Sequence, residues 1–252
     1  MGSKINSVIV NQPLILHKLG TFKPPPQFLA CVSLSSYGIR NEQGRHISTP
    51  SSSTTSTQVK IADPSCCSIK FKTLGACKLG ISRYPDFIYD AAGGTGTGLG
   101  QKMIERNTSV DDELKVSFDP ETLYIPALSS ETTRFLGLPL PPFLKIEIIP
   151  EFFGGYINQQ TGKVDLEFLA KFCFSVGTIY RAPPLIVKTV LTSEESIGSI
   201  RRGSGERMNA QGNCRLVGVA TVDPVDDFFI NSFLGLPTEC LADLNAVISL
   251  SS

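Results

Sequence analysis

The sequence is poor in histidine and contains no tryptophan. Its two histidines, His17 and His46, both lie in the first 50 of 252 residues. Histidine is the commonest general base near neutral pH and the commonest ligand of transition metals. If the amino-terminal segment is removed, the remaining chain has no imidazole for either role. This absence excludes most histidine-dependent mechanisms, and we expect no metal and no cofactor.

Acidic residues are almost missing from residues 1–60, where Glu42 stands against six Lys and Arg. Fifteen of these sixty residues are Ser or Thr. A basic, hydroxyl-rich and acid-poor composition is typical of an organelle transit peptide. A disordered tail that the protein keeps would have the same composition. We favour a transit peptide and, from the Ser and Thr excess, a chloroplast location in the stroma or at the thylakoid.

Long apolar runs are also missing. The most apolar stretch, 135–149, is interrupted by three prolines, Lys145 and Glu147, so no segment reaches the about 18 residues of a membrane-spanning helix. Without residues 1–60 the chain holds 17 Lys and Arg against 22 Asp and Glu, a net charge of about −5. Binding to phosphates requires the opposite sign. We therefore expect no transmembrane segment and no nucleic-acid partner.

Residues 61–252 are predicted to form one β-rich domain. Apolar residues alternate with mostly polar ones over 163–175, which is the period of a half-buried antiparallel strand. The glycine-ended connection before it, 158–162, suits a hairpin. Short strands separated by turn residues favour an antiparallel barrel or sandwich. The other predicted strands are 69–73, 87–89, 114–118, 144–149, 185–192 and 216–222.

One or two carboxy-terminal helices are expected to pack on this sheet. Asp223 and Pro224 have the pattern of a helix start, with the helix running to about Leu234, and a second helix is expected from Pro237. The sequence Phe-Leu-Gly-Leu-Pro occurs at 135–139 and again at 233–237. We interpret both copies as a helix end with a left-handed glycine followed by proline, and not as an internal repeat.

A glycine-rich segment provides the first candidate site. Gly94, Gly96, Gly98 and Gly100 occupy alternate positions, so a strand here has one face without side chains. Such a face can form the floor of a flat ligand slot, or it can be covered by side chains from a neighbouring strand. Neither the Gly-x-Gly-x-x-Gly pattern nor the Walker pattern fits the segment.

Tyr89 and Asp90 directly precede these glycines and provide the second candidate. Asp90 has the parity of the glycine face, so the pattern predicts that its carboxylate points to the same side. A buried carboxylate there would be a candidate acid or base. An Asp before glycines also commonly stabilises a turn through its own backbone contacts, and we favour that interpretation.

Basic residues and one cysteine complete the candidates. Arg201, Arg202 and Arg207 surround two glycines and can hold a carboxylate or phosphate, although a solvated hairpin tip has the same composition. Cys173 lies two positions from Lys171 on the predicted strand, where a nearby ammonium would make the thiol a redox candidate. The six cysteines after residue 60 form no Cys-x-x-Cys pair, so zinc is not expected.

Three functions fit these observations. The first is a non-catalytic barrel that binds an apolar small molecule such as a lipid, isoprenoid or pigment. The second is an assembly or accessory factor of a plastid protein complex. The third is an isomerase or cyclase that uses Asp90, Glu147 or a tyrosine as its acid or base. We favour the first two, which are both non-catalytic.

Overall fold

The computed structural model describes residues 66–81, 83–102 and 113–251. The chain divides into two units, Met1–Thr57 and Gln58–Ser252, and every described residue belongs to the second. The predicted transit peptide, with His17 and His46, lies outside the described residues. Within the described ranges, no helix has the length and apolarity required to cross a membrane.

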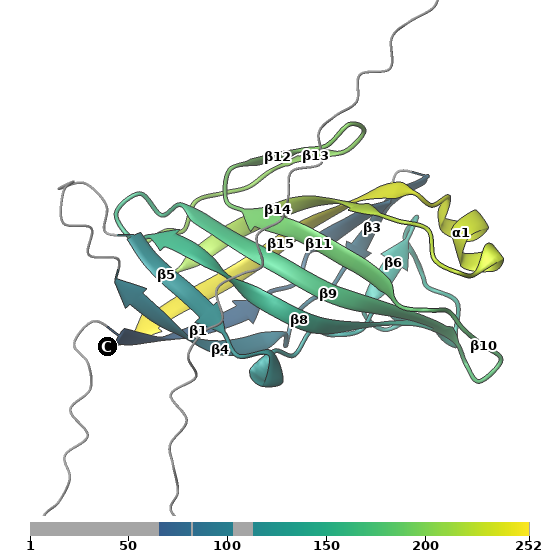
Figure 1. Cartoon of the computed structure of the whole chain (residues 1–252), viewed down its shortest axis with the longest axis horizontal. Helices are drawn as coiled ribbons and strands as arrows, with labels where there is room; N and C mark the ends of the chain where they lie inside the picture. Colours follow the sequence, from purple (N-terminus) through teal and green to yellow (C-terminus); the bar gives the residue numbers. More distant parts are fainter. Residues whose placement is uncertain (1–65, 82, 103–112, 252) are drawn as a thin grey trace, which may run out of the picture. The chain divides into compact units, whose positions relative to one another are not determined.

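An antiparallel sheet closes on itself to form a barrel (Figure 1). The strand order is β1, β4, β5, β8, β9, β11, β14 and β15, and β15 pairs again with β1. Pairing of the last strand with the first closes the ring, although β11 and β14 are registered only through Thr192 and Val217. The strands of this ring are β1 (Cys66–Thr73), β4 (Thr95–Lys102), β5 (Glu113–Phe118), β8 (Leu144–Asn158), β9 (Val164–Val176), β11 (Leu185–Thr192), β14 (Asn213–Val222) and β15 (Thr238–Ser251).

Four further strands extend the wall near one end of the barrel. β2 (Cys77–Ile81) pairs with β15 beyond the point where β1 ends, and β3, β6 and β7 follow it in order. Their bounds are β3 (Tyr84–Tyr89), β6 (Thr133–Phe135) and β7 (Leu138–Pro139). The same end carries β10 (Tyr180–Arg181) and helix α1 (Phe228–Leu234). We call it the helix end of the barrel.

Two smaller elements lie elsewhere. A short 3-10 helix, Pro120–Thr122, follows β5, and a separate hairpin is formed by β12 (Glu195–Ile197) and β13 (Arg202–Ser204). A Cβ at Gly203 would lie 3.0 Å from Leu241 and 3.3 Å from Val217, so the hairpin packs on β14 and β15. This packing explains why the outward-facing Val217 is fully buried.

The mainly β, antiparallel architecture predicted from the sequence is confirmed. All the predicted strands are present, and β9 matches the alternating segment 163–175 closely. Its inward positions form one apolar face because neighbouring residues of a strand point to opposite sides. This face consists of Val164, Leu166, Phe168, Ala170, Phe172 and Phe174, while Asp165, Glu167, Lys171 and Cys173 lie on the other side.

The prediction of a second carboxy-terminal helix is wrong, because residues 238–251 form β15. Its apolar residues fit a period of two as well as a helical period. Cys240, Ala242 and Leu244 face the interior. As β15 pairs with β14, β1 and β2, the extended form satisfies backbone groups along both of its edges. This hydrogen bonding depends on distant strands, so the local sequence pattern does not predict it.

The start of the first helix was also predicted too early. Asp227, and not Asp223, caps α1, and its carboxylate accepts a hydrogen bond from the backbone N–H of Ile230 at 3.0 Å. The expected helix before Gly137 is absent from the described chain, which forms a turn and then β6 there. Both glycines of the duplicated sequence are left-handed, with φ of 82° at Gly137 and 70° at Gly235.

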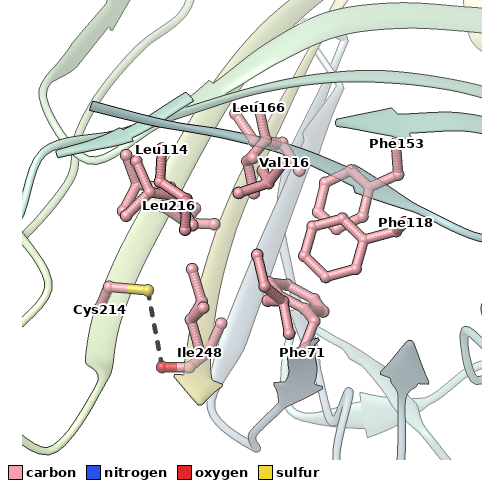
Figure 2. Packing of buried hydrophobic residues seen from close by; sticks show 14 residues of the cluster. Phe71, Leu114, Val116, Phe118, Phe153, Leu166, Cys214, Leu216 and Ile248 are labelled. Atoms are coloured by element: carbon pink, nitrogen blue, oxygen red, sulfur yellow. Dashed lines mark hydrogen bonds between the residues drawn. The ribbon is translucent and has the colours of Figure 1, made fainter. Parts of the chain in front are cut away.

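The half of the barrel away from the helix end is filled with side chains (Figure 2). Phe118 and Phe153 stack with ring centroids 4.8 Å apart, and Phe71 meets Phe153 edge-on at 5.0 Å. Leu166 and Leu216 are fully buried beside them. This packing closes the interior at one end of the barrel.

Candidate functional site: an apolar cavity inside the barrel

The interior near the helix end is hollow. A cavity of about 560 Å³ is lined by Phe71, Phe153 and Phe168 next to the packed core and by residues of the helix end. This volume lies within the about 300–1,000 Å³ range of small-molecule sites. Leu136 and Leu138 both line the cavity and are 71% and 70% exposed, so the cavity opens to the surface beside the turn between β6 and β7.

The strands place an aromatic wall around this cavity. Phe87 of β3 stacks on Phe135 of β6 at 4.8 Å. Phe174 of β9 contacts Phe233 of α1 at 5.9 Å, and Phe233 also meets Tyr84 at 5.8 Å. These rings line the cavity because they occupy inward positions of the sheet or the inner side of the helix.

Several hydroxyl groups in the lining are already bonded within the protein. The Tyr84 hydroxyl donates to the carbonyl of Phe233 at 2.6 Å, and the Thr189 hydroxyl donates to Val219 at 2.8 Å. Thr73 donates to Ala91 at 2.5 Å. Tyr89 donates to the carbonyl of Pro126. The lining therefore presents mainly carbon atoms to a molecule inside it.

No Asp, Glu, Lys, Arg or His is among the described residues that line the cavity. Burial raises the pKa of the Tyr89 hydroxyl above its ordinary value, so this group stays protonated at neutral pH. Burial likewise raises the pKa of the Cys240 thiol to about 11. The interior is thus uncharged at neutral pH. Nor do three or more His, Cys, Asp or Glu gather as a metal site anywhere in the described ranges.

The predicted glycine face does point inward, but most of it is covered. A Cβ at Gly96 would lie 2.4 Å from the Leu123 side chain, and one at Gly100 would lie 2.8 Å from Ile69 and Leu114. At Gly98 it would lie 2.4 Å from the backbone oxygen of Ser117. Close packing against neighbours therefore explains the absence of side chains at these three positions.

Two of the predicted site residues reach the cavity. Gly94 and Tyr89 both line it. Ligand binding by Gly96, Gly98 and Gly100 stays a prediction, since neighbouring side-chain or backbone atoms cover them and they lie outside the lining.

The expectation that Asp90 points to the glycine side is wrong. Asp90 is exposed and its carboxylate accepts a hydrogen bond from the backbone N–H of Ala92 at 3.0 Å. The reason is that β3 ends at Tyr89 and a turn precedes β4, so the parity of a continuous strand does not carry across. Asp90 has the turn-stabilising contact that its position before the glycines suggested.

Arg201 holds the β12–β13 hairpin to the barrel wall. Its guanidinium forms an ion pair with Asp86 at 2.6 Å and donates to the carbonyls of Ile81 at 2.6 Å and Tyr84 at 2.8 Å. Only 18% of its side chain is exposed. These contacts assign Arg201 a structural role.

The other two predicted arginines lie apart from the cavity lining. Arg207 forms an ion pair with Glu194 at 2.5 Å, and Arg202 is exposed on β13. Anion binding at Arg202 and Arg207 stays a prediction.

A site that the sequence did not reveal lies where this hairpin begins. The buried carboxylate of Glu239 accepts three backbone N–H groups, from Ser199 at 2.7 Å and from Ile200 and Arg201 at 2.8 Å each. Consecutive amides that converge in this way form an anion-binding nest. They lower the pKa of Glu239. The nest is occupied by the protein's own carboxylate.

Cys173 lies on the outer side of β9, opposite Glu147 of β8. The ammonium of Lys171, which the sequence places two positions from this thiol, forms an ion pair with Glu151. A redox role for Cys173 stays a prediction. Glu147 pairs with Lys145 at 2.7 Å on the same outer side, so it does not face the cavity.

Comparison with known proteins gave no match. No family model, no curated protein and no solved structure is similar to this chain. The cavity is therefore the feature that indicates the function.

Proposed function

We propose that this chain is a binding protein whose barrel holds an apolar small molecule, such as a lipid, isoprenoid or pigment. The observation that carries the proposal is the open cavity of about 560 Å³, whose lining contains no charged side chain among the described residues. Transfer of apolar surface from water into such a space is favourable by about 25 cal/mol per Å².

The lining also favours an uncharged ligand. An ionised head group inside the cavity would lose its water and find no counter-charge, which is strongly unfavourable. The hydroxyls of Tyr84, Tyr89 and Thr189 already donate to backbone carbonyls. Any polar part of the ligand is therefore expected at the mouth, near Leu136 and Leu138.

Binding of the neutral dye Nile red to the full chain tests the proposal. Val187 of β11 lines the cavity, whereas its neighbour Ile186 faces outward and is 48% exposed. We expect Val187→Phe to weaken dye binding at least about tenfold by filling space, and Ile186→Phe to leave it unchanged. Equal dye binding by both variants and the unchanged protein would overturn the proposal.

Competition then defines the ligand class. Dodecanol and dodecanoic acid have the same chain length but differ in charge at neutral pH. We expect the alcohol to displace Nile red better than the acid, because the carboxylate must keep its water at the mouth and so limits how far the chain can enter the cavity. A preference for the acid would show that a positive group reaches the ligand and would contradict the uncharged-ligand proposal.

The catalytic alternative finds less support. Asp90 and Glu147 both face away from the cavity, and the Tyr89 hydroxyl donates to Pro126.

A role as an accessory factor and a chloroplast location both remain proposals. Amino-terminal sequencing of the protein from plant tissue tests the cleavage of residues 1–60, and native gels of organelle extracts test the association with a complex.

A further inference from the structure

Large exposed apolar side chains gather at the helix end of the barrel. Elements far apart in the sequence, β6 with β7, β10 and α1, lie together there (Figure 1). Ile179 is 91% exposed, Phe228 87% and Phe143 78%. We call this set the rim; it consists of Leu136, Leu138, Phe143, Ile179, Phe228, Phe229 and Phe233.

The rim is continuous with the cavity. Phe229 and Phe233 of α1 stack at 5.9 Å, and Phe229 meets Tyr180 of β10 at 5.1 Å. Leu136, Leu138 and Phe233 belong both to the rim and to the cavity lining. The rim and the cavity lining therefore form one continuous apolar surface.

Two bulky, exposed residues of the rim have a left-handed backbone conformation. Leu136 and Phe143 are left-handed, with φ of 51° and 75°. Bulky residues rarely adopt this conformation, which Asn and Gly adopt at lower cost. Because both side chains are mostly exposed, at 71% and 78%, burial within the protein offsets little of this cost, which points to a partner outside the described structure.

Helix α1 presents apolar side chains on both of its sides. Ile230 and Leu234 are buried against the barrel, whereas Phe228 and Phe229 are 87% and 54% exposed. A surface helix normally has a polar outer face. Phenylalanine on the outer face is typical of helices that lie in a lipid interface.

The charges around the rim cancel. The segments that carry it, 133–143, 177–183 and 223–237, together with Arg83, hold three arginines and three aspartates. At the opposite end of the barrel, the turns 159–162 and 209–212 expose no large apolar side chain. Among the described residues, the helix end is therefore more apolar than these two turns at the opposite end, and the charges around the apolar side chains balance.

We propose that the rim docks on the surface of an uncharged lipid bilayer, so that the ligand passes between bilayer and cavity without crossing water. A bilayer fits better than a protein partner because the rim surrounds the mouth of a cavity for an apolar molecule. It carries no net charge to select an acidic or basic protein surface. This inference rests on the proposed function of the cavity.

Flotation of the full chain with phosphatidylcholine vesicles tests the inference. We expect co-flotation that is unchanged between about 0.1 and 1 M salt, since no net charge contributes. The double variant Phe143→Asn, Phe228→Ser removes two rim side chains that do not line the cavity. It should reduce vesicle binding at least about tenfold.

A matched control uses exposed apolar residues away from the rim. Ile197 and Ile200 are 72% and 71% exposed near the β12–β13 hairpin, and the variant Ile197→Ser, Ile200→Asn should float like the unchanged protein. Thermal unfolding confirms that both variants fold. Equal flotation of the two double variants would overturn the inference, as would absence of flotation of the unchanged protein.

The two proposals fail in different ways. If the unchanged protein binds Nile red but does not float, the cavity proposal stands and docking is wrong. Concentration-dependent dimerisation that Phe143→Asn, Phe228→Ser abolishes, without flotation, would identify a second copy as the partner of the rim and overturn the bilayer. Retained dye binding with lost flotation in that variant supports docking.

Discussion

At the scale of single residues, the glycines of β4 show how a pattern can arise from packing. Each inward Cβ on this strand would meet a different neighbour: the Leu123 side chain at Gly96, and the backbone oxygen of Ser117 at Gly98. A flexible side chain can shift, whereas a strand backbone paired with two neighbours cannot. A methyl group is therefore expected to destabilise the fold more at Gly98 than at Gly96.

Gly98→Ala is expected to destabilise the fold by about 2 kcal/mol or more, because overpacking against backbone forces strands apart. Gly96→Ala should cost clearly less, since Leu123 can rotate away from the new methyl group. Urea unfolding of both variants, followed by circular dichroism, measures the difference in the free energy of unfolding. An equal loss in the two variants would contradict this explanation of the glycine pattern.

At the scale of elements, two polar contacts help to hold the β12–β13 hairpin on the barrel. Glu239 of β15 accepts the three amides of 199–201, and Arg201 reaches Asp86 near the start of β3. The first of these depends on pH. The amides lower the pKa of Glu239 below the ordinary 4.5, so its contribution to stability is present above 4.5 and lost as the pH falls through the lowered value.

We therefore expect the amides of Ser199, Ile200 and Arg201 to be protected from hydrogen exchange at neutral pH and to lose protection in acid. Glu239→Gln should remove that protection at neutral pH, because an amide side chain carries no charge. Exchange measured by mass spectrometry on the hairpin peptide, with the β8–β9 turn as reference, checks both. Unchanged protection in Glu239→Gln would show that the other contacts of the hairpin hold it without the Glu239 carboxylate.

The element that local reasoning misassigned is as informative as those it predicted. The apolar spacing of 238–251 is compatible with a helix and with a strand, and the choice was made by pairing with β14 on one side and with β1 and β2 on the other. By contrast, β9 alternates over its full length, so only the two-residue period of a strand fits it. Prediction succeeded where local pattern was unambiguous.

At the scale of the whole molecule, the barrel interior is filled at one end and contains a cavity at the helix end. The aromatic cluster of Phe71, Phe118 and Phe153 forms the boundary between them. A packed core at one end supplies stability, so the other end can remain open without loss of the fold. Occupation of the cavity should then stabilise the whole barrel, because a ligand that binds only the folded state shifts the equilibrium toward it.

Cys240 provides a native probe of that occupation. Its thiol lines the cavity, and burial raises its pKa to about 11. Since the thiolate is the reactive form, labelling by N-ethylmaleimide should be slow at neutral pH and accelerate about tenfold per pH unit below 11. Bound ligand should slow it further, while the exposed Cys66 stays reactive; mass spectrometry of the labelled peptides measures both.

Ligand-independent labelling of Cys240 would place the dye or alcohol outside the cavity. Cys214 serves as the internal control, because it is buried in the filled half, where burial raises its pKa to about 12. Its labelling should respond to global unfolding only.

The sequence by itself determined the antiparallel, mainly β class and the positions of the long strands, because side-chain alternation is a local property of each strand. It also indicated Tyr89 and Gly94, which reach the cavity. Only the tertiary structure decided that 238–251 is a strand, that Asp90 faces outward, and that a cavity lies inside the barrel near the helix end. Each of these depends on which distant residues meet, and ring closure between β1 and β15 joins segments almost the whole domain apart.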